Sequence, residues 1–323
     1  MKQRGDWLGE TYDYVDKTVE LAEKTRKKVR DCLDSDKRTF KNIAAIFAIL
    51  QYASRTLNHP LSAYFQALRA QSDIGRLLQE VPELWNATCP VFSPSLEATL
   101  RRWRDDLLNC RPRRVHPGEM PTAFLICDSS SDGWGAAFVS PCGGTNWAVG
   151  GWTDADYAQN IPGHSARAEP VGIARALMKF LMPTGPPVRL VIATDSMTAK
   201  FVMAAGFSKS YFVNAVINEL NVHFQHREVD IRAFHLAGEA MPVDGISRGN
   251  RYITTEEWER IEELGRCARE HDDFIGVETK RHPESGQKYM LAYGGSGVDP
   301  DDHWFLPLQS YQPSDPLRQL ATG

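Results

Sequence analysis

Four acidic residues stand where the chain changes from one kind of element to the next: Asp128, Glu169, Asp195 and Asp244. Asp128 ends an apolar run over residues 123–127, and Asp195 follows another over residues 188–193. A carboxylate at the end of a buried strand is costly to ionise unless something offsets its charge. If folding brings these acids together, protons or divalent cations must therefore accompany them.

A cluster of this kind suits phosphodiester hydrolysis, which needs an activated water and stabilisation of charge on the phosphate oxygens. Two divalent ions roughly 4 Å apart can supply both. Mg²⁺ prefers carboxylate oxygens to Cys or His ligands. We expect Asp128 and Asp195 to share both ions, while Glu169 and Asp244 each complete one. Taken singly, each acid could instead be a helix cap or a solvated turn residue, the interpretation that we adopt for Asp132.

Other polar residues near these acids are candidates for supporting roles. His235 ends a strand-like run and could shuttle protons, because a histidine pKa lies close to neutrality; an orienting hydrogen bond in a turn is the alternative. Ser129 and Ser196 each follow an acid directly and could bind a phosphate or a ribose, or simply cap a helix. Arg248, in the segment that follows Asp244, is a further candidate for substrate binding.

The hydrophobic pattern between residues 121 and 250 predicts strands and helices in a definite order. Strands are expected at 123–127, 135–140, 145–151, 188–194 and 229–235, and helices at 165–181, 198–205, 211–225 and from about 244. Three strands come first, and helices and strands then alternate. This order predicts an α/β fold with a mixed sheet whose antiparallel strands come first.

The flanking segments have a different character. The first is expected to be mainly helical, with helices at 17–33, 39–57, after Pro60 and at 95–108, followed by a linker at 111–121. Its basic blocks, 24–30 and 101–114, are either solvated helix faces or phosphate contacts. The last segment should hold one helix at 254–270, capped by Thr254 or Thr255, and then short strands or a partly disordered tail.

Composition restricts the class of protein. The 323 residues allow one large or two ordinary domains, and a net charge of -4 argues against a generally basic nucleic-acid binder. Six cysteines without zinc spacing indicate free thiols in a reducing compartment. No apolar run is long enough for a membrane span, and the polar start lacks a secretion signal. We therefore expect an intracellular protein, in the cytoplasm or the nucleus, with no membrane partner.

Several motifs resemble those of retroelement ribonuclease H domains. They are residues 124–130 and 133–136, Gly151-Trp152, His164, Glu169, residues 193–196, 235–238 and 244–248. Elements of the tyrosine-recombinase (DIRS-like) class are the most similar, followed by gypsy-like ones. Residues 6–10 and 17–21 resemble the chain just beyond the polymerase palm of a reverse transcriptase. The final motif departs from the family, because residues 240–243 read Ala-Met-Pro-Val, one residue shorter than usual.

The resemblance implies a ribonuclease H-like fold with a mixed five-stranded sheet at 117–250. It also implies thumb- or connection-like helices at 1–116 and a C-terminal helix with an irregular tail at 251–323. The implied activity is Mg²⁺-dependent endonucleolytic cleavage of RNA in RNA–DNA hybrids, with two Mg²⁺ ions or Mn²⁺ in their place. The other partner implied is the polymerase portion of a reverse transcriptase, since this chain alone lacks the polymerase Asp-Asp motif. The alternatives are a catalytically silent or domesticated remnant that binds nucleic acid or a protein, and a structure-specific resolvase.

Overall fold

The computed structural model describes residues 3–35, 37–115, 120–270, 274–281, 288–294 and 304–307. The chain forms two compact units: residues 1–120 with 205–226, and residues 121–204 with 227–323. The division at residues 116 and 250 expected from the sequence stays a prediction. Across the described ranges, no helix is both long enough and apolar enough to cross a bilayer.

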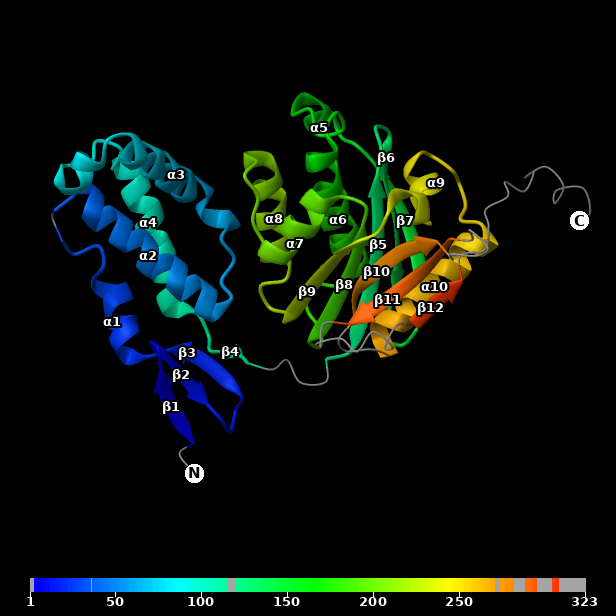
Figure 1. Ribbon diagram of the computed structural model, residues 1–323, viewed down its shortest axis with the longest axis horizontal. Coiled ribbons are helices and arrows are strands. Elements are labelled where there is room, and N and C mark those ends of the chain that lie inside the picture. Colours follow the sequence, from blue (N-terminus) through cyan, green and yellow to red (C-terminus); the bar gives the residue numbers. More distant parts are fainter. Residues whose placement is uncertain are drawn as a thin grey trace, which may run out of the picture. The chain divides into compact units, whose positions relative to one another are not determined.

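A five-stranded sheet organises the second unit (Figure 1). Its strands are β5 (Thr122–Ser129), β6 (Gly133–Val139), β7 (Thr145–Gly151), β8 (Val188–Thr194) and β9 (Val229–His235). The spatial order is β7-β6-β5-β8-β9; β5, β6 and β7 pair antiparallel, while β5, β8 and β9 pair parallel. The predicted mixed five-stranded sheet is confirmed, with its antiparallel strands first in the chain.

Two long helices cover opposite faces of this sheet, α6 (Ser165–Phe180) and α10 (Thr255–Glu270). Phe124 of β5 belongs to a buried cluster that includes Leu264 of α10. On the other face, Phe138 of β6 stacks on Phe180 of α6 with ring centroids 5.2 Å apart. Successive strand residues point to opposite faces, so both sides of the central strands are apolar. Each fully buried large apolar side chain stabilises the fold by about 1.5–3 kcal/mol.

Shorter elements complete the second unit. They are α5 (Asp154–Ala158), α7 (Met197–Ala205), a 3₁₀ turn η3 (Gly238–Ala240), α9 (Asp244–Ser247), β10 (Phe274–Arg281), β11 (Lys288–Gly294) and β12 (Trp304–Pro307). Thr254 caps α10, since its hydroxyl accepts from the Glu257 N–H and the Glu257 carboxylate accepts from Thr254. The short strands expected in the tail are present as an antiparallel sheet. The remainder of the predicted tail lies outside the described residues.

The first unit contains strands that the sequence analysis did not predict. An antiparallel sheet joins β1 (Arg4–Trp7), β2 (Glu10–Asp13), β3 (Thr18–Leu21) and β4 (Arg113–Arg114). The helix expected at 17–33 is wrong over its first part, where β3 buries Val19 and Leu21, and α1 (Glu23–Asp31) forms only afterwards. Val19 and Leu21 are two residues apart and share one face of a strand, a period that the longer helical pattern conceals.

Helices make up most of the first unit, and the mainly helical character predicted for residues 1–116 is confirmed; α8 forms where a helix of the middle segment was expected at 211–225. They are α2 (Phe40–Leu57), η1 (Ser62–Tyr64), α3 (Phe65–Glu80), η2 (Pro82–Asn86), α4 (Pro94–Asn109) and α8 (Tyr211–His223). Their core includes Trp103, which stacks on Tyr64 and donates to the Ser54 hydroxyl at 2.8 Å. Within the basic blocks, Arg101 pairs with Glu97 and Arg104 with Asp105. Arg101, 45% exposed on its side chain, fits the solvated helix face, whereas the ion-paired Arg104 is only 17% exposed.

Candidate metal centre

Asp128 is held at the end of β5 by contacts from α9. Its side chain is 4% exposed, and the Ser247 hydroxyl donates a hydrogen bond to Oδ2. This contact depends on Gly135 of β6, because a Cβ at that position would lie 2.7 Å from the Ser247 backbone nitrogen. The second glycine of the Gly-Trp-Gly motif therefore lets α9 pack against the sheet beside Asp128.

Glu169 reaches the same site from α6 on the other side of the sheet. Its side chain is 3% exposed, and Oε1 accepts from the Ser129 N–H at 3.2 Å. The helix lies unusually close to β5, since a Cβ on Gly172 would meet the Ser129 hydroxyl. Among the described residues, Oε2 of Glu169 is buried and has no hydrogen-bond partner. An unpartnered buried carboxylate oxygen is costly unless a proton or a cation accompanies it.

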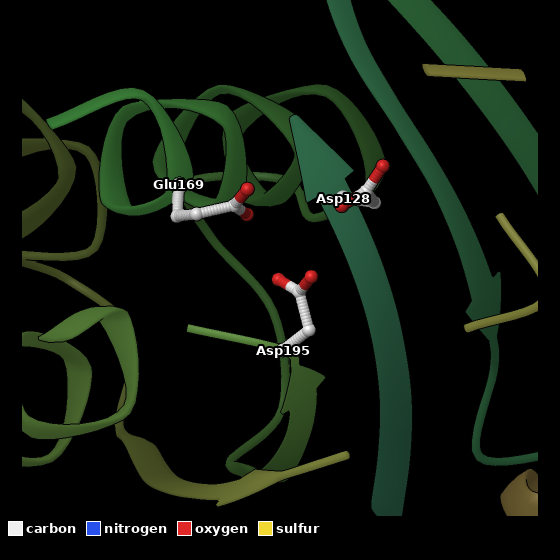
Figure 2. A group of neighbouring side chains, drawn as sticks. All are labelled: Asp128, Glu169 and Asp195. Carbon is white, nitrogen blue, oxygen red and sulfur yellow. The ribbon is translucent and has the colours of Figure 1, made fainter. Parts of the chain in front are cut away.

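Asp195 follows the end of β8 and completes a group of three. One carboxylate oxygen from each of Asp128, Glu169 and Asp195 lies within 4.8 Å of the others. Figure 2 shows the three side chains coming from a strand, a helix and the segment after a strand, with the carboxylates of Glu169 and Asp195 facing a common space. A Cβ on Gly238 would lie 3.3 Å from Asp195 Oδ2, so this glycine leaves room for the carboxylate.

Burial and mutual repulsion make these acids hard to ionise. Burial is the largest cause of a raised pKa in all three. The pKa of Asp128 rises to about 6 and that of Glu169 to about 9, and the charges of neighbouring acids add to both shifts. The pKa of Asp195 is also raised, although the charge of His235 opposes that shift. Without a cation the site therefore holds at least one proton at neutral pH.

The three carboxylates fit a hard divalent cation. All offered atoms are oxygens, and they come from three separate elements whose positions are fixed by packing. The unpartnered Oε2 of Glu169 supplies a ligand that no protein donor satisfies. Oxygen-only sites of this type suit Mg²⁺ or Mn²⁺ better than Zn²⁺.

Asp244, the fourth predicted ligand, is near this group but outside it. It begins α9, and its charge contributes to the raised pKa of Asp128 and of Asp195. The carboxylate of Asp244 forms an ion pair with Arg248 at 2.8 Å, and the Asp244 side chain is 44% exposed. The structure therefore brings three of the four predicted acids within ligand distance, and Asp244 lies beside them, paired with the predicted substrate-binding arginine.

The other predicted residues occupy the surroundings of the acids. His235 ends β9 opposite Thr194 of β8, close enough for its charge to affect Asp195. The Ser129 hydroxyl donates to the Ala168 carbonyl at 3.3 Å, an internal contact that ties β5 to α6. The Ser196 hydroxyl accepts from the Ala199 N–H at 3.2 Å at the start of α7. Their roles toward a substrate stay predictions.

Ser247 is the residue that sequence reasoning missed. It is 2% exposed, bonds to Asp128, and accepts through its carbonyl from the Ser130 hydroxyl. Ser130 in turn accepts from the Trp152 indole N–H at 2.9 Å through its own carbonyl. The signals in the sequence were the position of Ser247 three residues after Asp244, on the same face of a helical turn, and its place in the motif at residues 244–248.

Comparison with known proteins gives a coarse likeness. No family model and no curated protein matches the chain. Among solved structures it is similar to the foamy viral protease-reverse transcriptase dRH in complex with double-stranded DNA, with 11% identity, TM-score 0.30, 73% of this chain and 38% of that chain covered. It is also similar to the foamy viral protease-reverse transcriptase in complex with double-stranded DNA, with 12% identity, TM-score 0.29, and 72% of this chain and 45% of that chain covered. For the same protein in complex with RNA/DNA hybrid the identity is 10% and the TM-score 0.29, with 96% of this chain and 39% of that chain covered. The chain thus spans less than half the length of these proteins.

Proposed function

We propose that this chain is a Mg²⁺-dependent endonuclease that cleaves the RNA strand of RNA–DNA hybrids. The observation that supports the proposal most is the convergence of Asp128, Glu169 and Asp195 to within 4.8 Å, with a buried unpartnered oxygen on Glu169. Three acids that repel one another beside the ends of the interior strands β5 and β8 lower the stability of the metal-free fold, so a function that uses their charge is the simplest account.

In this proposal each acid has a ligand role. Asp128 and Asp195 would ligate both Mg²⁺ ions, Glu169 would complete one and Asp244 the other. The bound ions would lower the pKa of a water and offset charge on the phosphate oxygens. Ser247 holds Asp128 in place, and the close packing of α6 and β5 fixes Glu169. His235, beside Asp195, would move a proton to or from the reacting oxygens.

Neighbouring polar groups would bind the substrate strand. The Ser196 hydroxyl acts as an acceptor toward Ala199, so its proton is not used by that bond and could be donated to a ribose 2′-hydroxyl or a phosphate. Contacts to 2′-hydroxyls are how proteins distinguish RNA from DNA. Arg248 is 66% exposed on its side chain and would meet a phosphate at the edge of the site.

We also propose that the chain is the C-terminal part of a retroelement reverse transcriptase. Residues 1–116 would correspond to the thumb or connection, and the polymerase portion would be a partner. The motifs at residues 6–10 and 17–21 support this assignment, and β1 to β3 give that segment a defined structure. The three-part division at residues 116 and 250 belongs to the same proposal.

A cleavage assay tests the activity directly. The purified chain is incubated with an RNA–DNA hybrid and with duplex DNA, in Mg²⁺ or in EDTA. We expect the RNA of the hybrid to be cut only in Mg²⁺ and duplex DNA to stay intact. Asp195→Asn should abolish cleavage, whereas Asp154→Asn, at an exposed acid in the first turn of α5, should leave it unchanged.

Two results would overturn the assignment. Cleavage that persists in Asp195→Asn would show that the acids are not the catalytic site. Hybrid binding without any cleavage by the wild-type chain would favour the alternative, a catalytically silent or domesticated remnant that binds nucleic acid. The ion pair between Asp244 and Arg248 is the observation that favours this second candidate. It pairs the Asp244 carboxylate with an arginine, while only the other three acids lie within 4.8 Å of one another.

A further inference from the structure

A hollow lies beside the acidic group on the face of the sheet that α9 covers. Its volume is about 340 Å³. The floor is formed by the paired glycines Gly133 and Gly151, and a Cβ on Gly151 would meet nothing within 4 Å. Small-molecule sites commonly begin at about this size.

The walls of the hollow come from both sides. Val149 and Trp147 of β7 share a face with Gly151, because residues two apart on a strand point the same way. Trp147 is 40% exposed and Val149 43% exposed. The loop after α9 supplies Asn250 and Arg251, both exposed, so an aromatic plane, an amide and a guanidinium border the same space.

Ser247 connects the hollow to the acids. Ser247 lines it and also donates to Asp128 Oδ2. A ligand in the hollow would therefore lie one side chain away from a proposed metal ligand. No residue of the proposed catalytic group other than Ser247 borders this space, so the hollow is a separate subsite that the cleavage chemistry does not require.

The tryptophan, the amide and the guanidinium of the lining fit one nucleoside, and the exposed acid Asp132 borders the same space. A half-exposed tryptophan offers a stacking surface for any base. Asn side chains pair with base edges, and arginine pairs with phosphate. A base paired within a duplex is stacked on both sides and cannot enter such a hollow, whereas an unpaired base can do so at little cost.

We propose that this hollow binds an unpaired nucleotide next to the scissile phosphate, so that the enzyme prefers hybrids carrying a bulge or a flap in the RNA strand. This inference rests on the proposed function for its substrate. The nucleobase stacks on Trp147, Asn250 binds its edge, and Arg251 meets its phosphate.

Binding in EDTA separates the inference from catalysis. The full chain is titrated with a hybrid that carries a fluorescent adenine analogue as a single-nucleotide RNA bulge, and with a fully paired hybrid of the same sequence. We expect quenching of the bulged analogue and about tenfold tighter binding of the bulged hybrid. Trp147→Ala and the hollow-filling Gly151→Val should abolish both, while Trp85→Ala, at a tryptophan of similar exposure (42%) in η2, should not.

The outcomes are distinct for the two proposals. Equal binding of bulged and paired hybrids, or equal loss in Trp147→Ala and Trp85→Ala, would overturn the subsite even if paired hybrids are cleaved in Mg²⁺. Selective bulge binding lost only in the two hollow variants would support the subsite. If that selectivity occurs without any cleavage in Mg²⁺, the proposed nuclease function fails and the subsite stands.

Discussion

At the scale of single residues, the candidate site depends on which groups neutralise or orient each carboxylate. Glu169 receives one backbone donor and leaves one oxygen unpartnered. Asp128 receives a hydroxyl donor from Ser247, which opposes the effect of burial on its pKa. A hydroxyl that donates to a carboxylate favours the ionised form, the form that can ligate a cation.

Replacing Ser247 by alanine should therefore make Asp128 harder to ionise. We expect the Asp128 pKa in Ser247→Ala to rise above its value of about 6, with a loss of about 1 kcal/mol in folding free energy. The measurement is a carboxyl-carbon NMR titration of the metal-free protein. Ser129→Ala is the control, because its hydroxyl bonds to a carbonyl rather than to an acid. An Asp128 titration that is the same in both variants would contradict the role given to Ser247.

At the scale of elements, glycines decide how closely the helices approach the sheet. Gly172 brings α6 against β5, and Gly135 brings α9 against β6. Both contacts fix the position of residues of the site, since α6 carries Glu169 and α9 carries Asp244 and Ser247. A side chain at either glycine would have to push a helix away, because the nearest atoms include backbone or buried groups.

Two alanine substitutions on neighbouring strands test this packing. Gly135→Ala should lose about 1–3 kcal/mol of stability, because its Cβ would lie 2.7 Å from atoms of Ile246 and Ser247. Gly151→Ala, where a Cβ meets nothing within 4 Å, should change stability by no more than about 0.5 kcal/mol. Urea unfolding of both variants provides the measurement. Equal stability losses would mean that strand propensity, not the approach of α9, governs these positions.

Most elements of the second unit could be predicted from hydrophobic pattern alone. The buried strands β5 and β8 are continuous apolar runs, and α6 and α10 show clear helical periods. The strands of the first unit could not be predicted, because β1 and β2 are four-residue, largely polar segments that depend on pairing for stability. The linker expected at 111–121 likewise contains β4, which forms only by pairing with β3.

The same limit applies to the site. Asp128 and Asp195 were predictable because each stands at the end of a buried strand, and Glu169 because it lies near the start of an amphipathic helix, in the second turn of α6. The bond from Ser247 to Asp128 joins residues 119 apart in the chain and requires the exact seating of α9, which no local pattern encodes. The hollow beside it depends on side chains that are absent at Gly133 and Gly151, and it becomes visible only in three dimensions.

At the scale of the whole molecule, the acidic group couples folding to pH and to divalent cations. In the unfolded chain Glu169 would titrate near its ordinary value of 4.5, whereas in the fold its pKa is raised to about 9. The folded state therefore binds this proton more tightly than the unfolded state does. The resulting stabilisation is fully present below about pH 4.5 and is lost as the pH rises through about 9.

The pKa of Asp128 is also raised in the fold, from 3.8 to about 6, so its proton stabilises the folded state over a lower pH range. Between about pH 6 and pH 9, the Glu169 proton still contributes to this effect, after the contribution of Asp128 has been lost. In EDTA, the free energy of unfolding of the wild type should fall relative to Glu169→Gln across that window, by on the order of 1 kcal/mol per pH unit. Glu83→Gln, at an exposed acid of η2, should follow the wild type.

Adding Mg²⁺ should remove the decline, because a ligand that binds only the folded, deprotonated site stabilises it by about 2.7 kcal/mol at a concentration of 100 times Kd. The gain should be larger at pH 8 than at pH 5, where protons compete with the cation, and it should be small in Glu169→Gln. Denaturant unfolding at several pH values, with and without Mg²⁺, provides the measurement. Parallel pH profiles for the wild type and Glu169→Gln in EDTA would show that Glu169 is not protonated in the metal-free fold. Equal gains from Mg²⁺ in both would show that it is not a cation ligand.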